Sequence, residues 1–280
     1  MNTAHIFKDL VDFRKYCDGL QADTEYRQLL PSMRATASAI SSIIGGRTLL
    51  AISELEDGNE GLELLKTAIA TGTLFRYQIF DSVKKNGSDA SLYKYQYEEI
   101  KEHHISAHWL AMDGLLNWLD INPEIGGYNE SKTYKDRQDL PVKNAEEFDY
   151  YYGIDRSSYF FSKVQFLIRS VWTGKLKPMI SGLEVNGELQ DLINRSLCYQ
   201  VIAEAVMKFD VTELPRSIRY DYNHEYSKGT SMQSRDKLYG DLMSQVHAWH
   251  ENIENLVQIQ KGVTAICMNT NVESDKFYVI

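Results

Sequence analysis

The chain has 280 residues and a net formal charge of −9, and its 43% hydrophobic and 25% charged residues are ordinary for a soluble globular protein. This acidic balance argues against a free-standing nucleic-acid binder, because phosphate contacts need clustered lysine and arginine. The length fits one large domain or two of ordinary size.

Cysteine usage and the amino terminus point to a cytoplasm-like compartment. Cys17, Cys198 and Cys267 are far apart and form no CxxC pair, so we expect reduced thiols and no disulfide framework. The first residues lack the basic start and apolar stretch of a signal peptide. No apolar run approaches the ~18–20 residues of a membrane span. We therefore expect no membrane partner.

Apolar periodicity predicts three helices in the first half. The first runs over about 24–44 and ends at Gly45-Gly46, the second over 59–84, and the third over 97–121. Between the last two, residues 92–97 alternate tyrosine with polar residues, which is typical of a short strand. The apolar stripe of the first helix, at three- and four-residue steps, consists of Leu29, Met33, Ala37, Ile40 and Ile44.

The second half repeats this plan after a linker. Residues 123–155 are rich in glycine and charge without a helical period, so we interpret them as a linker or long excursion. Helices are then predicted from about 157 to just before Gly174, over 187–209 and over 231–260. Residues 218–222 mirror the tyrosine-bearing strand. Residues 263–280, here called the C-terminal arm, are β-prone.

Shared spacings indicate that a helical unit is duplicated. Gly45, Gly58 and Phe80-Asp81 recur 129 positions later as Gly174, Gly187 and Phe209-Asp210, and Trp109 has its counterpart in Trp249. The predicted fold is mainly α, with two tandem pseudo-repeated helical units, short β-hairpins and an extended C-terminal arm. Its segments are a first unit at 1–122, a linker at 123–155, a second unit at 156–262 and the arm at 263–280.

Paired histidines are the sharpest catalytic-looking feature. His104 and His108 stand at i, i+4 on one face of a predicted helix, which is the spacing of paired zinc ligands. The metalloprotease pattern needs a glutamate directly after the first histidine, and here that residue is Ile105. A third ligand is not evident, so we interpret these side chains as half-buried polar residues. We therefore predict no metal-binding residue and no catalytic residue.

Other chemistries lack their motifs as well. Gly45-Gly46-Arg47-Thr48 has neither the preceding strand nor the Gly-Lys-Ser/Thr pattern of a phosphate loop, and no Gly-x-Ser-x-Gly elbow occurs. Acidic pairs such as Glu98-Glu99 are typical of solvated helix faces. We expect a protein that is not an enzyme and that has no cofactor.

Tyrosines and the arm are the candidate contact residues. The 18 tyrosines cluster in a way that suits wet, extended protein interfaces, although packing inside the fold accounts for part of them. The arm either joins a neighbouring chain by strand addition, folds back on its own chain or frays. The interface candidates are Tyr93, Tyr95, Tyr150, Tyr151, Tyr220 and Tyr222. The partner-binding candidates in the arm are Ile266, Val272, Phe277, Tyr278, Val279 and Ile280.

The order of these elements resembles the helical head–tail connectors, or adaptors, of tailed-phage necks. The residues that carry the likeness are Ser42-Ile43-Ile44-Gly45, Tyr95-Gln96-Tyr97-Glu98-Glu99 and the segment from Trp109 to Leu119. The resemblance covers the two helical regions and leaves the linker unexplained. It implies a mainly α-helical protein in a ring, commonly of twelve copies, whose extended termini clasp neighbours. The chain departs from the smaller members in having two units, which puts the ring number in doubt.

The resulting hypothesis is a structural virion protein, a ring-forming connector in the phage neck that is assembled in the host cytoplasm. Its partners would be itself, the portal protein and the tail or the next neck ring. DNA would pass through the channel without specific binding, since a channel of like charge avoids gripping it. The alternatives are a tail-completion or other virion protein, a cytosolic helical scaffold, and a metal hydrolase that uses His104 and His108.

Overall fold

The computed structural model describes residues 6–20, 22–85, 94–219 and 231–261. These residues are mainly helical, and no strand occurs among them. The elements of the first half are α1 (Leu10–Arg14), α2 (Tyr26–Ile44), α3 (Gly46–Ser53), α4 (Glu60–Lys85) and α5 (Lys94–Ile121). Those that follow are η2 (Ile125–Glu130), α6 (Lys132–Gln138), α7 (Ala145–Tyr151), α8 (Ser158–Val171), η3 (Trp172–Leu176), α9 (Lys177–Met179), α10 (Gly187–Lys208), η4 (Val211–Glu213) and α12 (Ser231–Gln260).

The first body is built on α4, which packs against both α2 and α5. The predicted stripe of α2 is confirmed, because all five of its residues are at most 1% exposed. Each of the four larger side chains of this stripe, all but that of Ala37, contributes about 1.5–3 kcal/mol on burial. Residues of α1, α3 and η2 complete the same hydrophobic core, which includes Phe13, Leu49 and Tyr128.

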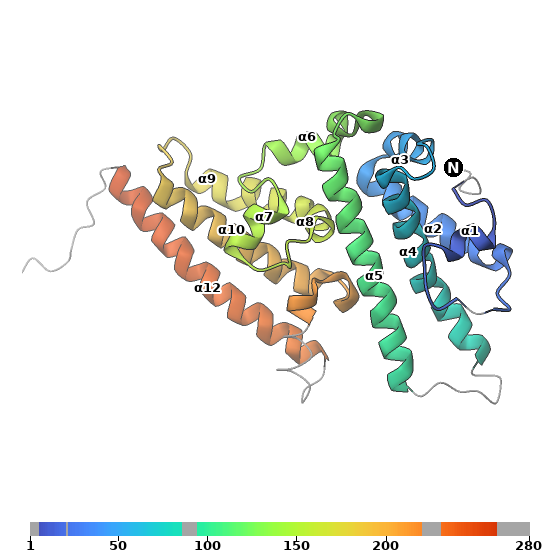
Figure 1. The fold of residues 1–280 in the computed structure, drawn as a ribbon. Coiled ribbons are helices and arrows are strands. Elements are labelled where there is room, and N and C mark those ends of the chain that lie inside the picture. The colour runs from blue at the N-terminus through green and yellow to red at the C-terminus, as the bar shows by residue number, and fades with distance from the viewer. Residues whose placement is uncertain (1–5, 21, 86–93, 220–230, 262–280) are drawn as a thin grey trace, which may run out of the picture.

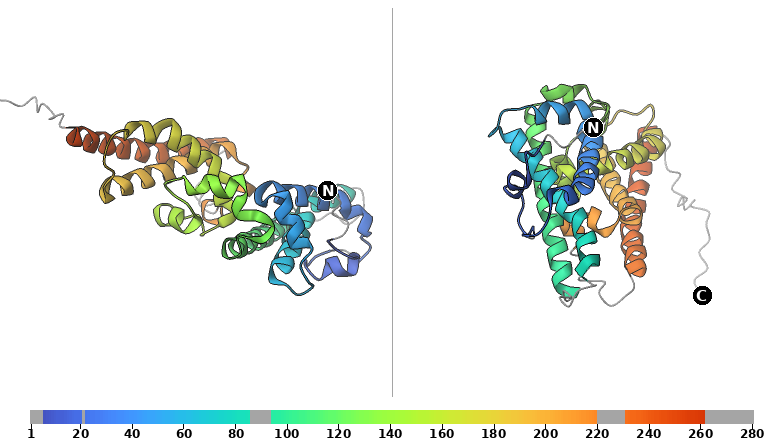
Figure 2. Two further views of the ribbon diagram at one scale, coloured as in Figure 1. Left: turned by 90° about the horizontal axis from the view of Figure 1, so that it is seen from above. Right: turned by 90° about the vertical axis from the view of Figure 1, so that its right-hand side faces the viewer.

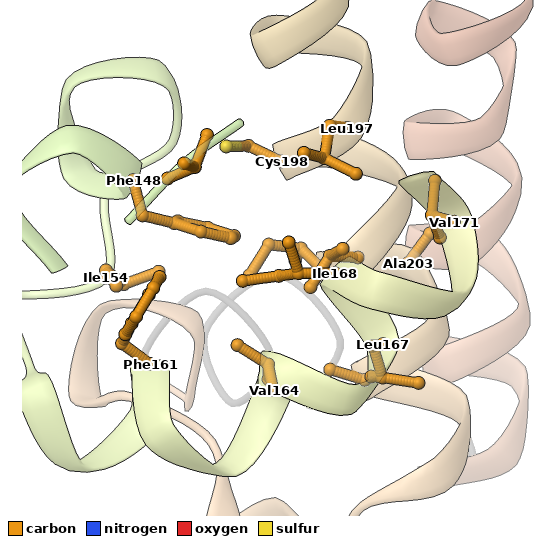
Figure 3. Close-up of a cluster of buried hydrophobic side chains, with 14 of the residues drawn as sticks. Phe148, Ile154, Phe161, Val164, Leu167, Ile168, Val171, Leu197, Cys198 and Ala203 are labelled. Carbon is orange, nitrogen blue, oxygen red and sulfur yellow. The ribbon is translucent and has the colours of Figure 1, made fainter. Parts of the chain in front are cut away.

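The second body is built on α10, which packs against both α8 and α12. Its core takes side chains from α7, α8 and α10 that point toward one another (Figure 3). Phe148, Phe161 and Ile168 lie at its centre, and each is at most 2% exposed. Viewed from above, the two bodies lie in line and make an elongated molecule (Figure 2).

Helix α5 belongs to both bodies and stands between them (Figure 1). Its Ile105 and Trp109 are part of the second core, whereas Met112 and Leu115 are part of the first. The Trp109 ring meets the Tyr159 ring of α8 edge-on, with 5.0 Å between ring centroids. Apolar residues on more than one side of a helix are expected when the helix is buried between two neighbours.

The prediction of short strands is wrong within the described residues. Residues 94–97 form the first turn of α5, and residues 216–219 are helical. The alternation of tyrosine with polar residues is a weak local preference, and in the folded chain these residues continue into helical neighbours. Tyr93, Tyr220 and Tyr222 lie outside the described residues.

The segment interpreted as a linker or long excursion has helical structure, although its sequence shows no helical period. Residues 123–155 contain η2, α6 and α7, and Tyr128, Leu140 and Phe148 are buried there. Short helices carry too few turns to show a clear apolar period, which is why composition alone suggests a linker.

The structure does not support the duplication. Gly45 ends α2 with a φ of 90°, but Gly174 lies inside η3, a π-helical segment that continues α8 directly into α9. Gly58 has a φ of 89° and precedes α4, whereas Gly187 is the first residue of α10. The equal spacing therefore joins residues with different backbone roles.

Among the described helices, none is by itself long and apolar enough to cross a membrane. The pair α2 and α3 passes that test only jointly, across a bend of 115°.

Candidate interaction surface

Helix α7 is fixed at its start by two reciprocal hydrogen bonds. The side chain of Asn144 accepts from the backbone N–H of Glu147 (2.8 Å), and the Glu147 carboxylate accepts from the backbone N–H of Lys143 (2.7 Å). Such a cap satisfies backbone donors that a helix start leaves without partners. The acidic residues of the first turn also complement the positive end of the helix dipole.

The loop after α7 is held just as firmly. Asp149 Oδ1 accepts from the backbone N–H groups of Ile154 (2.7 Å) and Arg156 (2.9 Å). Asp155 and Arg156 have φ values of 58° and 51°, which side-chain-bearing residues adopt only where neighbours hold them. The Asp155 carboxylate accepts from the backbone N–H of Ser217 at 3.0 Å. The start of α7 is therefore capped by local hydrogen bonds, and the loop after α7 is fixed to the segment that contains Ser217.

A groove of about 590 Å³ lies along α7 and reaches α10. Its lining residues are Pro141, Lys143, Asn144, Glu146, Glu147, Tyr150, Tyr151 and Asn194.

Two tyrosines give this groove its chemical character. Tyr150 is 75% exposed, and its ring meets the Tyr151 ring edge-on at 5.0 Å. Tyr151 is held in place by two residues of α10. The buried Asn194 donates a hydrogen bond to its hydroxyl at 3.3 Å, and the Arg195 guanidinium lies 5.8 Å from its ring. A rigidly backed, exposed aromatic ring is typical of a protein-contact surface, because little side-chain freedom is lost on binding.

The structure brings together two of the twelve predicted contact residues, Tyr150 and Tyr151, on this groove. Tyr95 lies in the first turn of α5, and its side chain is outside the described residues. The others also lie outside the described residues and stay predictions: Tyr93, Tyr220, Tyr222, Ile266, Val272, Phe277, Tyr278, Val279 and Ile280.

The paired histidines take part in helix packing. The His108 ring lies 3.0 Å from the backbone carbonyl of Ala68 on α4, and burial lowers its pKa to about 4. His104 is buried near the α1–α2 loop, where its ring faces Gly19, and burial followed by the neighbouring His103 lowers its pKa. Within the described part of the chain, no group of three His, Cys, Asp or Glu side chains is placed to hold a metal ion.

Sequence reasoning misses the polar lining of the groove. Lys143, Asn144 and Glu147 fall in the segment interpreted as a linker, and Asn194 stands out only as part of a helix. The pattern Asn144-x-x-Glu147 followed by Phe148 is the available signal, because it is a helix-start signature before an apolar residue.

Comparison with known proteins finds one partial match. Residues 171–261 match a family of unknown function (DUF6712). This segment runs from the last residue of α8 through α10 and α12, so it contains Asn194 of the groove but not α7. No curated protein and no solved structure matches the chain significantly.

Proposed function

We propose that the chain is a structural virion protein, a ring-forming head-to-tail connector in the neck of a tailed phage that docks on the portal and joins it to the tail. The observation that carries the protein-binding role is the groove along α7, with the 75% exposed Tyr150 on rigid support. The resemblance of the helical segments to neck connectors supplies the setting. The finer organisation, helical units at 1–122 and 156–262 with an arm at 263–280, is part of the same proposal.

The physical requirements of a ring support this assignment. A ring needs two different surfaces on each copy, one that receives and one that is received, repeated until the rotation closes. The groove is suited to the receiving role. The net charge of −9 suits a wall past which DNA slides, because like charge keeps the duplex from sticking.

The test measures the mass of the purified full-length chain by light scattering, alone and mixed with a portal protein. We expect a ring, of about twelve copies if the resemblance extends to ring number, and a larger complex with portal. Tyr150→Ala should weaken assembly at least tenfold, as expected for an aromatic side chain at the centre of an interface. Leu110→Ala is the matched control, because Leu110 is also 75% exposed but does not line the groove.

A chain that stays monomeric at high concentration and does not bind the portal protein would contradict the proposed connector function. Binding to tail components without portal would favour the tail-completion alternative. A monomer that captures one host protein would favour the cytosolic scaffold. One zinc ion per chain that is lost in His104→Ala would revive the metal hydrolase.

A further inference from the structure

The groove along α7 carries negative charge that its own surroundings leave unpaired. Glu146 and Glu147 both line it and are exposed, against a single lysine, Lys143. The Glu147 carboxylate accepts from the backbone N–H of Lys143 at 2.7 Å, and among the described residues no cation pairs with Glu146. The neighbouring Arg195 pairs with Asp191 at 3.3 Å instead. A ligand that carries lysine or arginine therefore complements this groove.

The two tyrosines of the groove offer a ring face and a hydroxyl group. The Tyr150 side chain is 75% exposed, so its ring is open to an apolar group. The Tyr151 hydroxyl accepts a hydrogen bond from Asn194 at 3.3 Å, which leaves its own O–H to donate. A ligand with an apolar ring beside a free carbonyl oxygen matches both groups.

Three of the recurring ways in which proteins bind peptides do not fit this groove. Strand addition needs a sheet edge, and no strand occurs among the described residues. An amphipathic helix needs a row of apolar pockets, whereas the lining residues other than Pro141 and the two tyrosines are polar or charged. Recognition of a phosphate needs clustered arginine, and the groove is lined by none. The mode that remains is a polyproline II segment on exposed aromatic rings.

A polyproline II segment suits both tyrosines for physical reasons. It has no internal hydrogen bonds, so its carbonyl oxygens are free to accept from a hydroxyl such as that of Tyr151. Proline has an apolar ring and no backbone N–H, so it covers the Tyr150 ring without leaving a donor unpaired. The segment is extended before it binds, so little conformational freedom is lost on binding.

This chain has no such segment outside the described ranges. Its five prolines all lie within those ranges, at positions 31, 123, 141, 178 and 215. The longest stretch outside them, 262–280, also has the wrong charge, because Glu273 and Asp275 outnumber Lys276. A ligand of this chemistry therefore belongs to another protein.

We propose that the groove along α7 binds an extended, basic and proline-containing segment of a different protein. A proline of that segment lies on the Tyr150 ring, a backbone carbonyl accepts from the Tyr151 hydroxyl, and a lysine or arginine lies at Glu146. This inference rests on the protein-binding role proposed for the groove, and it adds the chemistry of the partner.

Selection from a random peptide library tests the ligand class. Twelve-residue peptides made by mRNA display are selected on the immobilised full-length chain and sequenced. We expect enrichment of peptides that combine proline with lysine or arginine, on the natural chain and on Leu110→Ala, whose altered residue is equally exposed but outside the groove. The enrichment should disappear on Tyr150→Ala. No enrichment, or enrichment of acidic or proline-free peptides, would overturn the proposal.

A double-variant cycle tests the charge pairing. The most enriched peptide is labelled with fluorescein, and its affinity is measured by fluorescence anisotropy. Glu146→Gln should weaken binding roughly two- to fivefold, the range of a surface ion pair. The same substitution should have no effect on a peptide whose lysine and arginine are replaced by alanine. Equal losses for both peptides would show that the basic residue does not lie at Glu146.

The outcomes separate this inference from the proposed function. Peptide binding does not require a ring, so a monomer that selects basic proline-containing peptides through Tyr150 contradicts the connector and supports the inference. A stable ring that binds portal but selects no such peptides overturns the inference and leaves the connector standing. A monomer that selects no peptides contradicts both.

Discussion

Gly72 shows at the residue scale how closely the first body is packed. A β-carbon at this position of α4 would lie 2.7 Å from the methyl group of Thr36 on α2 and 2.8 Å from the His108 ring on α5. Real side-chain contacts are not this short, so three helices approach one another here only because glycine lacks a side chain.

Gly72→Ala should therefore destabilise the protein although alanine is the better helix former. We expect a loss of about 1–3 kcal/mol in the free energy of unfolding, as for overpacked cores, measured by urea denaturation. Gly240→Ala in α12 is the control, because a β-carbon there would have no neighbour within 4 Å among the described residues. That variant should gain about 0.5–1 kcal/mol. A stabilising effect at both positions would contradict the close approach.

His250 makes stability depend on pH. Its side chain is buried, and neither ring nitrogen has a hydrogen-bond partner among the described residues. Burial, then the charges of Lys175 and His247, lowers its pKa from 6.5 to about 4. The unfolded chain therefore binds more protons than the folded chain between these values. The contribution of neutral His250 to the free energy of unfolding is therefore complete above pH 6.5 and is lost as the pH falls toward 4.

His250→Leu should flatten this pH dependence, because the titrating group and its unpaired nitrogens are both removed. Between pH 6.5 and 4, the free energy of unfolding of the wild type should fall by up to about 3 kcal/mol more than that of the variant. Denaturation at each pH measures this difference. His247→Gln, at an exposed position of the same helix, is the control and should leave most of the profile in place. Parallel profiles for His250→Leu and wild type would contradict the assignment.

At the scale of elements, α5 fixes the start of α8. Asp113 Oδ1 accepts from the hydroxyl of Ser157 (2.9 Å) and from the backbone N–H of Tyr159 (2.8 Å). Ser157 in turn accepts from the backbone N–H of Phe160, so a carboxylate of the first body extends the cap of a helix in the second. Burial is the main influence on Asp113 and raises its pKa.

Asp113→Ala should destabilise the protein by about 1–2 kcal/mol, the effect of losing a helix cap. Thermal unfolding followed by circular dichroism measures it. Ser158→Ala removes only an exposed hydroxyl that donates to Asn117 at 2.6 Å, so it should change stability by less than about 0.5 kcal/mol. Equal losses in both variants would show that Asp113 has no special role at this junction.

The long helices are predictable from the sequence because each has several apolar turns. The expected helix at 231–260 coincides with α12, and those at 24–44 and 59–84 differ from α2 and α4 by two residues or fewer at each end. Helix α3 is missed because Gly45-Gly46 indicates a stop, whereas Gly46 also begins the next helix. A glycine pair ends one helix without saying whether another follows.

The candidate site is predictable only as a pair of residues. Tyr150 and Tyr151 stand out because adjacent tyrosines suit contact surfaces. The groove around them cannot be predicted, because it also needs Asn194. The hydrogen bond from Asn194 to Tyr151 joins residues 43 positions apart, and such a contact leaves no local sequence pattern. The anchoring of α7 by Asp155 and Ser217 spans 62 positions and is hidden for the same reason.

At the scale of the whole molecule, the shared helix α5 should make the two bodies unfold together. Leu115→Ala in the first core and Val164→Ala in the second should each destabilise the whole molecule, which should still unfold in a single transition. For Leu115→Ala the free energy of unfolding should fall by about 2–5 kcal/mol. Tryptophan fluorescence and circular dichroism should give coincident curves. Two separated transitions in either variant would show that the bodies are independent.

The family match covers only part of the residues that form the core of the second body. The match begins at Val171, but the hydrophobic core to which α10 contributes also contains Phe148, Phe160 and Val164, which precede it. Helices α10 and α12 alone would therefore form a hairpin with a bare apolar side. In this chain that side is covered by α7 and by α8, of which only Val171 belongs to the matched segment. The matched residues therefore supply one side of this interface, and residues outside the match supply the other.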